Sequence, residues 1–418
     1  MATGHGVKLG SGGMGSDISA GFVDLDRMRK ERLAKAKAAM KKSGLPAALL
    51  FRPENIRYVT SMKFVEFIER LRYCIAFAEH EPLIFEPFGK PLWDAPWIDP
   101  SQQRLSLHWA SQSPGEKAVY EATRAFAEGI KKELKDKGLE KEKLGIDEID
   151  EAGRQALIDA GLNIVNVMPT MLDARAIKTQ DEINCLHMAT ALCDSAHYAM
   201  YENLKPGVRE RDIKAIGMDS LIRNGAEEIW DVLVSAGGQI GGLSLNSDKI
   251  IQPGDVVTID IVRAKYLGYN TCYYRNYSVG KKPSEKEKEL HRKSYERLYA
   301  VLEAIKPGVS TDELANHWMP AKEKGFPSEH YMWCDDLAHG IGLWLYEYPI
   351  CNRLWSLEHP MTIEQGMTMA VEAMEWDTIV GRTKLEEMIV VTENGAEMFS
   401  RMPVKDMMVA SYIETVET

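Results

Sequence analysis

The feature that most constrains the fold of this chain is a pattern that occurs twice in its second half. LKPGVRERDI begins at Leu204, and IKPGVSTDEL begins at Ile305. Each segment follows a helical pattern and precedes another, and Pro and Gly end the first helix before the second begins. The repeat predicts two copies of a helix–helix unit, and therefore an internally duplicated domain.

A second repeated pair extends the duplication to strands. IIQPGDVVTID holds Gly254 and ends at Asp260, and TIEQGMTMAVE holds Gly366 and ends at Glu372. In each copy, a turn glycine precedes an apolar, strand-like run that ends in an acid. Duplication would place Asp260 and Glu372 in equivalent positions about a pseudo-twofold axis, facing one cleft. The alternative is coincidence, because KPG and PGD turns are common.

The first half of the chain alternates helical and strand patterns, which is typical of an α/β domain. The helical patterns cover residues 24–44, 116–138 and 151–161, and the strand patterns are PAALLF, KLGIDEI and a hairpin, CIAFAEHEPLIFEPF, that turns at Glu79–Pro82. We therefore expect a glycine-rich flexible tail at residues 1–20, an α/β domain at 21–172 and the duplicated domain at 173–418. Thr179 followed by Glu182 is a capping box, which predicts the start of a long helix.

The composition excludes several classes of protein. The 418 residues carry a net charge of -11, whereas a nucleic-acid-binding protein needs a basic face. No apolar run approaches the roughly 20 residues that a membrane-spanning helix needs, and the N-terminus lacks a signal-peptide pattern. The six cysteines are scattered and form no CxxC pair, which fits a reducing compartment. We expect a cytoplasmic protein that acts on a small molecule, with no nucleic-acid or membrane partner.

Several ionisable residues are candidates for chemistry. His339 opens HGIGLWLYEYP, whose glycines let the backbone approach a ligand closely. KLEEMIVVTENG contains Glu386 and Glu387, and strand alternation turns one of them inward. With Asp260 and Glu372, these side chains are typical ligands of a metal site. The alternative is that basic side chains neutralise the acids, and the candidates are Arg263, Lys265, Arg275, Arg382 and Lys384.

Segments along most of the chain resemble one superfamily. They are RAIKTQDEI, IQPGDVVTID, LGYNTCYYRNYSVG, HGIGLWLYEYP, EQGMTMAVEAMEW and KLEEMIVVTENG within residues 172–418, and PENIRYVTS in the first half. The chain resembles the pita-bread superfamily of creatinase, aminopeptidase P and prolidase. The resemblance implies an α+β fold, with a duplicated C-terminal pita-bread catalytic domain after a smaller creatinase-type N-terminal α/β domain. It also implies a homodimer in which the N-terminal domain of one subunit lies near the other's active site.

The resemblance implies site residues as well as departures from the family pattern. Peptidases of this fold use two aspartates, one histidine and two glutamates, and His339, Glu372 and Glu386 match the last three. Cys272 stands where the second aspartate belongs, and Tyr346, a further catalytic candidate, replaces a second histidine. Two divalent ions a few ångströms apart need bridging carboxylates to offset their repulsion. The loss of one carboxylate therefore predicts that at least one metal ion is absent.

Three hypotheses for the site stay open. In the first, Asp260, His339, Glu372 and Glu386 hold one Zn, Mn or Fe ion, with Cys272 available as a fifth ligand. In the second, the site is metal-free and His339 transfers protons, while the two glutamates orient it and bind a cationic or amide substrate. In the third, Cys272 and His339 act as nucleophile and base. A non-enzymatic binding protein is a further alternative.

Aromatic and charged side chains are candidates for substrate binding. Trp230 precedes a loop that edges the pocket in relatives, and Trp344 follows the HGIG motif. Aromatic walls suit a quaternary ammonium, a sulfonium or an aromatic ring, and the alternative is core and dimer packing. Glu347 and Arg72 are the charged candidates. Arg72 lies close to where relatives bind a substrate carboxylate, a bidentate task that suits arginine, and the alternative is a solvated face.

These observations predict an enzyme that processes a small molecule. The expected reaction is hydrolysis of a C–N (amide-type) bond in a small polar or zwitterionic metabolite, at a reduced or absent metal site. One alternative is an Xaa-Pro-type metallopeptidase. Another is a lyase of a sulfonium compound such as dimethylsulfoniopropionate, a branch that the chain resembles in PENIRY, HGIGL, MTMAVEA and KLEE. Leu345 stands where that branch's catalytic aspartate would lie.

Overall fold

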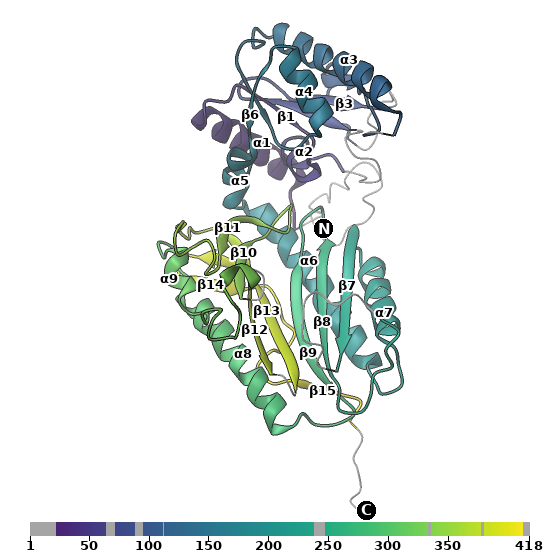
Figure 1. Ribbon diagram of the computed structural model, residues 1–418, viewed down its shortest axis with the longest axis vertical. Coiled ribbons are helices and arrows are strands. Elements are labelled where there is room, and N and C mark those ends of the chain that lie inside the picture. The colour runs from purple at the N-terminus through teal and green to yellow at the C-terminus, as the bar shows by residue number, and fades with distance from the viewer. Residues whose placement is uncertain are drawn as a thin grey trace, which may run out of the picture. The chain divides into compact units, whose positions relative to one another are not determined.

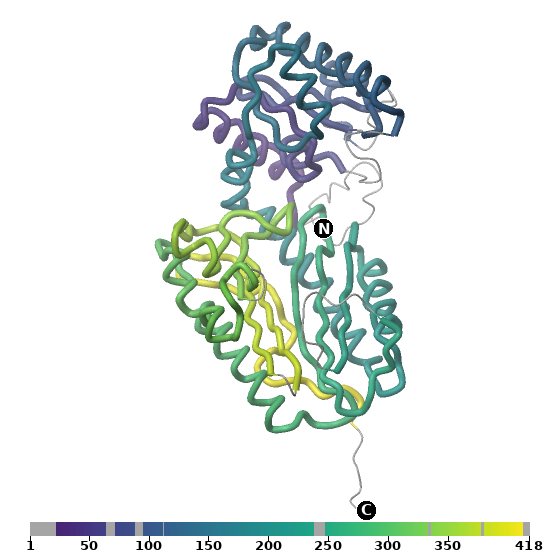
Figure 2. Tube along the Cα trace, viewed as in Figure 1, coloured from purple at the N-terminus to yellow at the C-terminus, as the bar shows by residue number. Residues whose placement is uncertain are grey.

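The chain folds into two compact units, which are described separately. The computed structural model describes residues 22–63, 72–87, 95–111, 113–237, 247–332, 336–377 and 380–412. The units are Met1–Arg175 and Ala176–Thr418, and Figures 1 and 2 show the path of the chain in each. The expected boundary between residues 172 and 173 falls inside the helix α5 (Met168–Ala176). The expected flexible tail at 1–20 lies outside the described residues.

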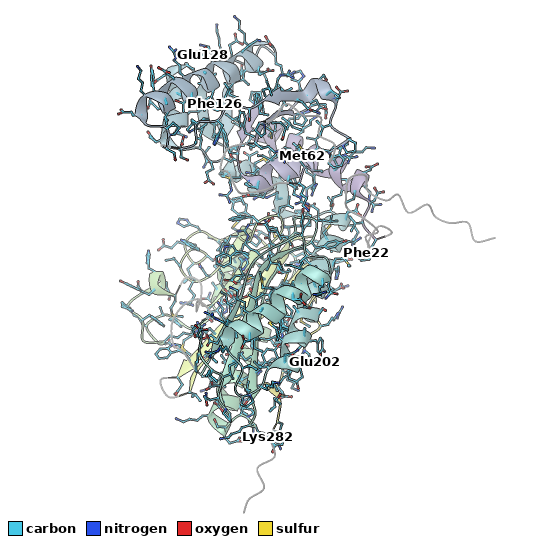
Figure 3. All side chains as sticks on the ribbon, turned by 90° about the vertical axis from the view of Figure 1, so that its right-hand side faces the viewer. Phe22, Met62, Phe126, Glu128, Glu202 and Lys282 are labelled. Carbon is cyan, nitrogen blue, oxygen red and sulfur yellow. The ribbon has the colours of Figure 1, made fainter. Side chains whose placement is uncertain are left out.

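The first unit is a six-stranded mixed sheet with helices packed against it, in the strand order β4-β3-β2-β1-β5-β6. In chain order its elements are α1 (Leu25–Lys42), β1 (Ala47–Leu50), α2 (Pro53–Thr60), β2 (Tyr73–Phe77), β3 (Leu83–Glu86), β4 (Gln103–Leu105), α3 (Glu116–Lys135), β5 (Lys143–Ile146), α4 (Glu151–Asp159), β6 (Asn163–Asn166) and α5. The predicted hairpin is confirmed, because β2 and β3 pair antiparallel. On α3, Phe126 packs in the core and Glu128 is exposed (Figure 3).

The second unit contains two antiparallel β-ribbons, each extended into a sheet and covered by helices (Figure 1). Its sheets have the orders β15-β9-β8-β7 and β11-β10-β12-β13-β14. In chain order the elements are α6 (Gln180–Asn203), α7 (Glu210–Arg223), β7 (Glu228–Ala236), β8 (Val256–Lys265), β9 (Cys272–Val279), α8 (Glu285–Ala304), α9 (Thr311–Ala315), β10 (Leu337–Gly340), β11 (Glu347–Cys351), β12 (Thr368–Asp377), β13 (Gly381–Thr392), β14 (Gly395–Met398) and β15 (Met408–Ala410).

The start of the long helix α6 follows from the sequence. Thr179 and Glu182 form the predicted capping box, in which the Thr179 backbone N–H donates to the Glu182 carboxylate at 2.8 Å. The helix buries much of its surface against β8 and β9, because the 24 residues include few charges after the first turn. No helix within the described residues is long and apolar enough to cross a membrane.

Equivalent backbone hydrogen bonds support the predicted duplication at the two KPG turns. The N–H of Gly207 donates to the carbonyl of Ile251 at 2.9 Å, and the N–H of Gly308 donates to the carbonyl of Ile363 at 2.8 Å. Both glycines have positive φ, at 91° and 92°, which L-residues with a Cβ rarely adopt. The two turns therefore share one conformation.

The turns that lead into β8 and β12 are equivalent in the same way. The N–H of Gly254 donates to the carbonyl of Val279 at 2.7 Å, and the N–H of Gly366 donates to the carbonyl of Val391 at 2.8 Å. The φ angles of the two glycines are 94° and 86°. The duplicated strands thus begin from matched turns, and the predicted equivalence of Asp260 and Glu372 holds for the backbone.

Arg275 joins the two ribbons, which are the antiparallel strand pairs β8–β9 and β12–β13. Its buried guanidinium donates to the backbone carbonyl of Glu386 at 2.6 Å and to the side-chain carboxylate of Glu387 at 2.9 Å. It also donates to the carbonyl of Met402 at 2.9 Å. Glu387 is therefore the glutamate that serves the fold. Its neighbour Glu386 lies on the opposite face of β13, where it pairs with Glu372.

Candidate active site

The candidate site lies between the inner faces of the β8–β9 and β12–β13 ribbons. Residues that pair across antiparallel strands, and residues two apart on one strand, share a face. The pairs on these faces are Asp260–Tyr274 and Val262–Cys272 in the first ribbon, and Glu372–Glu386 and Met374–Lys384 in the second. The site therefore holds three carboxylates, a thiol, a phenol and an ammonium, nearly all of them buried.

His339, at the end of the short strand β10, completes this group. Its Nε2 lies 3.8 Å from Oε1 of Glu386. One ligand atom each of His339, Glu386 and Cys272 lie within 4.8 Å of one another. The sequence predicted that these three residues would share a site, and the structure brings them together.

The hydrogen bonds of His339 define its tautomer. Nδ1 lies 3.2 Å from the carbonyl oxygen of Gly340, which can only accept, so Nδ1 carries the proton. Burial lowers the pKa of His339 to about 4, against the opposing effect of backbone carbonyls. The imidazole is therefore neutral at pH 7, and its Nε2 lone pair is directed toward the acids. That geometry suits a general base or a metal ligand.

Two of the three carboxylates, Asp260 and Glu386, form no ion pair with a lysine or arginine among the described residues. Their polar neighbours are Tyr274 beside Asp260, and Cys272 and His339 beside Glu386. Burial raises the pKa of Asp260 to about 7, while Tyr274 and Lys384 oppose the increase. Burial, and then the charges of Glu372 and Asp260, raise the pKa of Glu386. A buried carboxylate without a partner is costly unless a proton, a cation or a ligand completes it.

Lys384 already partners the third carboxylate. Its Nζ lies 2.8 Å from Oε2 of Glu372 and 4.5 Å from the ring centroid of Tyr274. Lys384 was one of the basic residues considered as neutralising partners, and for Glu372 that alternative is confirmed. The sequence analysis did not identify Tyr274 as a member of the site, and it did not single out Lys384 among the five basic candidates. Their positions, two residues before Glu386 and two after Cys272, were the available signal, because alternate strand residues share a face.

The Cys272 thiol is not activated by its surroundings. Burial, and then the charges of Glu386 and Asp260, raise its pKa well above the usual range. A nucleophilic cysteine needs the thiolate, which cationic neighbours favour and carboxylates disfavour. The Cys272–His339 pair therefore has the proximity that the third hypothesis requires, but its electrostatics oppose that chemistry.

Tyr346 and Trp344 lie in the loop between β10 and β11. The Tyr346 ring contacts the His339 ring edge to face, with centroids 4.7 Å apart, and Tyr346 is 37% exposed. The guanidinium of Arg263 lies 4.3 Å from the Trp344 ring centroid. Tyr346 thus connects the buried imidazole to the surface, which agrees with its place among the catalytic candidates.

The other residues predicted to bind the substrate are Glu347, Trp230 and Arg72. Glu347 forms a buried ion pair with Lys178 at 3.0 Å and accepts a hydrogen bond from the Trp344 backbone at 3.1 Å. Its carboxylate is thereby committed to the fold of the loop, so its contact with a substrate stays a prediction. Trp230 is 56% exposed on β7. Arg72 belongs to the first unit, where it pairs with Glu86.

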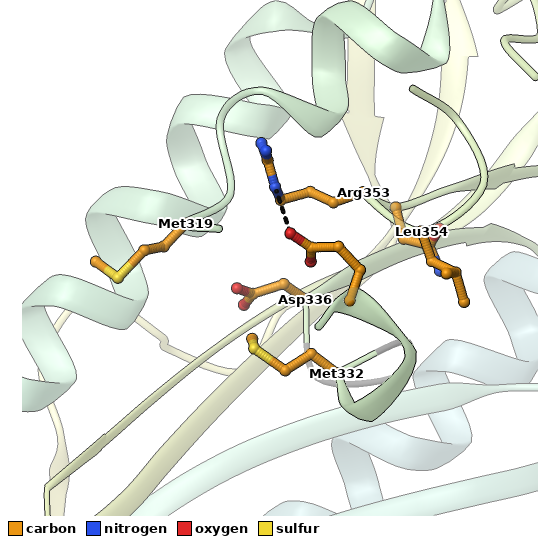
Figure 4. A pocket seen from close by; sticks show the side chains of 7 residues that line it. Met319, Met332, Asp336, Arg353 and Leu354 are labelled. Atoms are coloured by element: carbon orange, nitrogen blue, oxygen red, sulfur yellow. Dashed lines mark hydrogen bonds and ion pairs between the residues drawn. The ribbon is translucent and has the colours of Figure 1, made fainter. Parts of the chain in front are cut away.

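A small pocket elsewhere in the second unit shows why a hollow alone does not define the site. Figure 4 shows its lining residues, which are Met319, Glu329, Met332, Asp336, Asn352, Arg353 and Leu354. Arg353 pairs with Glu329 at 3.2 Å, and Asp336 pairs with the buried Lys324. Its charged groups therefore satisfy one another, in contrast to the carboxylates around His339.

The comparison with protein families decides the family. The model of metallopeptidase family M24 matches residues 184–393. The chain belongs to this family. The match begins in α6 and ends after β13, so it includes both ribbons and every residue of the candidate site. The predicted superfamily is thereby confirmed.

Two curated relatives of this M24 chain have names that indicate different reactions. A Xaa-Pro dipeptidase of Pyrococcus furiosus is 31% identical over 232 residues, which cover 55% of this chain and 64% of that protein. A dimethylsulfoniopropionate lyase of Roseobacter denitrificans is 26% identical over 399 residues, which cover 91% of this chain and 87% of that protein. The match to the dipeptidase thus spans less than two thirds of its length, whereas the match to the lyase includes both units.

Solved structures confirm the predicted α+β pita-bread fold. A prolidase of Pyrococcus horikoshii superposes with a TM-score of 0.69 at 23% identity, covering 90% of this M24 chain and all of that chain. A Xaa-Pro dipeptidase of Bacillus anthracis gives a TM-score of 0.71 at 22% identity, covering 91% and 99%. At these identities, the likeness concerns the fold.

The donor set of this M24 chain fits one divalent ion better than two. Thiol, imidazole and carboxylate donors from Cys272, His339 and Glu386 converge, and this combination suits zinc or iron. The buried Glu386 carboxylate, which pairs with no lysine or arginine among the described residues, favours a cation there. A second ion beside Glu372 would meet the Lys384 ammonium, so a dinuclear centre does not fit these residues.

Proposed function

We propose that this chain hydrolyses a C–N bond of the amide type in a small polar or zwitterionic metabolite, at a site with one metal ion or none. The observation that supports the proposal most is the buried acidic group around His339. In the part of the chain that the structure describes, Asp260 and Glu386 form no ion pair with a lysine or arginine. Acids that served only the fold would be paired, as Glu387 is with Arg275.

His339 is the proposed proton-transfer group. Its neutral Nε2 would take a proton from the water that attacks the amide carbon and would return it to the departing nitrogen. Glu386, at 3.8 Å, would stabilise the imidazolium that forms in between. Tyr346 contacts the imidazole ring and is partly exposed, so its hydroxyl would donate a hydrogen bond to the bound substrate.

The charge of the site favours a substrate with a cationic group. Three carboxylates outnumber the single ammonium of Lys384 within the ribbon faces. The rings of Tyr346 and Trp344 suit a cation as well. If a divalent ion is bound, Cys272, His339 and Glu386 would hold it, and it would polarise the carbonyl of the substrate.

A sulfonium lyase is the second candidate, and one observation favours it. The dimethylsulfoniopropionate lyase of Roseobacter denitrificans matches 91% of this chain, whereas the Xaa-Pro dipeptidase of Pyrococcus furiosus matches 55%. A base that removes a proton next to a carboxylate would start the elimination, and His339 is again the available group. An Xaa-Pro peptidase with two metal ions is less well supported, because Lys384 neutralises Glu372.

The test separates the reactions by their products. The full-length protein is incubated with amides, dipeptides, creatine-like compounds and betaines, and released amine is measured; dimethylsulfoniopropionate is assayed in parallel by release of dimethyl sulfide. His339→Gln should lower turnover by about 10²–10⁴-fold. His291→Gln is the matched control, because His291 is also buried and its Nε2 bonds the Val404 carbonyl at 2.9 Å rather than facing an acid of the site.

Release of amine that depends on His339 would support the hydrolase. Release of dimethyl sulfide without amine from any compound would replace it with the lyase. A ligand that stabilises the protein without any turnover would favour a binding protein instead. The homodimer and the cytoplasmic location stay predictions, and light scattering on the purified protein tests the first.

A further inference from the structure

Lys384 carries a positive charge into the interior of the acidic group. It projects from β13 and is 7% exposed, and its Nζ lies 2.8 Å from Oε2 of Glu372. The ring centroid of Tyr274 lies 4.5 Å from the same atom. A buried ammonium needs a carboxylate or an aromatic face in place of its water. Lys384 has both, and both belong to the inner faces of the ribbons.

The acids around Lys384 outnumber it. Asp260 and Glu386 are 2% and 0% exposed, and within the described ranges neither forms an ion pair with a lysine or arginine. The positive charge of Lys384 lowers the pKa of each, although burial has the larger, opposite effect. The net charge of the site therefore favours binding of a further cation. The position that this cation can occupy is restricted.

The ion pair restricts that location. A divalent ion bound to the Glu372 carboxylate would lie within a few ångströms of the ammonium that already occupies it, and the two like charges would repel strongly. Donor atoms of Cys272, His339 and Glu386 lie within 4.8 Å of one another, and no lysine or arginine belongs to this group. Glu372 is thus already paired with a cation, whereas the group of Cys272, His339 and Glu386 can bind one.

We infer that Lys384 is a built-in cation of the site, which fills the Glu372 side and confines any divalent ion to the side formed by Cys272, His339 and Glu386. Removal of Lys384 then creates a second cation site between Glu372 and Asp260. The inference concerns charge inside the site and does not depend on which bond the protein cleaves. Two ions in the wild-type protein would overturn both the inference and the expected count of one ion or none in the proposed function, whereas loss of amine release would overturn only the proposed hydrolysis.

The experiment counts bound ions in the full-length protein and in Lys384→Met. Mn²⁺ and Zn²⁺ are the probes, bound ions are titrated by calorimetry, and metal content is measured after dialysis. The wild-type protein should bind at most one ion per chain. Lys384→Met should bind one more than the wild type, with an affinity for Mn²⁺ at least about tenfold above any second binding by the wild type. Lys384→Arg keeps the charge and should behave as the wild type does.

Lys178→Met is the matched control. Lys178 is also buried and pairs with a single buried carboxylate, that of Glu347, at 3.0 Å. This variant should gain no ion, because its pair lies outside the ribbon faces that hold Asp260, Glu372 and Glu386. Equal ion counts for Lys384→Met and the wild type would overturn the inference. If Lys384→Met does not fold, the wild-type count decides: two ions per chain at saturation would overturn the inference, and one or none would support it.

Discussion

The two ribbons of the duplicated domain share a backbone but differ in charge. Asp260 and Glu372 occupy equivalent places after matched turns, yet the residues that pair with them across the strands are Tyr274 and Glu386. The first ribbon therefore presents one acid among neutral side chains. The second presents two acids and the ammonium of Lys384.

The difference shows which positions the fold requires and which it leaves to chemistry. Gly254 and Gly366 both need positive φ, so each copy keeps its glycine. The inner positions have no such requirement. Cys272 in the first copy and Lys384 in the second hold corresponding places, and a thiol and an ammonium are both accommodated. The chemistry of the site can thus diverge while the duplicated backbone persists.

Removal of the contact that joins the ribbons should have the largest effect. Arg275→Met would leave the Glu387 carboxylate and the carbonyls of Glu386 and Met402 buried without their donor. Loss of one partner of a buried ion pair costs about 3–5 kcal/mol. The free energy of unfolding of the second unit, measured in urea, should fall by this amount.

An arginine on the surface provides the control for Arg275. Arg292→Met breaks the exposed ion pairs with Glu289 and Glu296 on α8. Exposed pairs contribute less than about 1 kcal/mol, so this variant should unfold almost as the wild type does. Similar decreases in the free energy of unfolding for the two variants would contradict the proposed role of Arg275 in holding the ribbons together.

Acid should destabilise the first ribbon before the second. His197 on α6 is fully buried against β9, where its Nδ1 bonds the Tyr277 hydroxyl at 2.9 Å. Burial, and then the charge of Arg275, lower its pKa from 6.5 to about 3. As the pH falls below 6.5, His197 becomes protonated in the unfolded chain but stays neutral in the folded protein. The associated stability is complete above that pH and is lost progressively down to pH 3, with about 2 kcal/mol lost at pH 5.

Hydrogen exchange at pH 8 and pH 5 measures this effect. Amides of β9 should lose protection at pH 5 more than amides of β13, which pack on the apolar face of α8. His197→Phe should reduce the pH dependence of the unfolding free energy in this range. Equal loss of protection in both strands would argue against the prediction.

The two turn glycines should respond unequally to the same change. An added Cβ at Gly254 would meet the Lys281 side chain at 3.7 Å, whereas at Gly366 it would meet the Ile177 side chain at 2.9 Å. Alanine at positive φ costs about 1–2 kcal/mol at either site, and the close contact adds about 1 kcal/mol at Gly366. Thermal unfolding of Gly254→Ala and Gly366→Ala measures the difference, and the reverse order would contradict it.

Local signals in the sequence predicted much of the fold. The capping box of Thr179 and Glu182, the hairpin of β2 and β3, and the matched turn glycines are short-range patterns with a direct physical cause. The family resemblance then identified the order of the elements. Domain limits were less certain, because α5 continues through the expected boundary at residue 172.

The chemistry of the site was harder to predict, because it depends on contacts between distant strands. Alternation identifies which face Lys384 occupies, but it does not reveal that its ammonium reaches Glu372 rather than Asp260. The sequence also gave no indication that Lys178 would occupy the Glu347 carboxylate. Trp230 was predicted to bind the substrate because it precedes a loop that edges the pocket in relatives. It is 56% exposed on β7.

The central claim is that the charges of the two ribbons direct a metal ion away from Glu372. The most direct test is a crystal of the wild-type protein grown with zinc and measured by anomalous scattering. The structure predicts that any zinc peak lies among Cys272, His339 and Glu386, with Lys384 still bonded to Glu372. A zinc ion bound to the Glu372 carboxylate, with Lys384 displaced from it, would contradict the account.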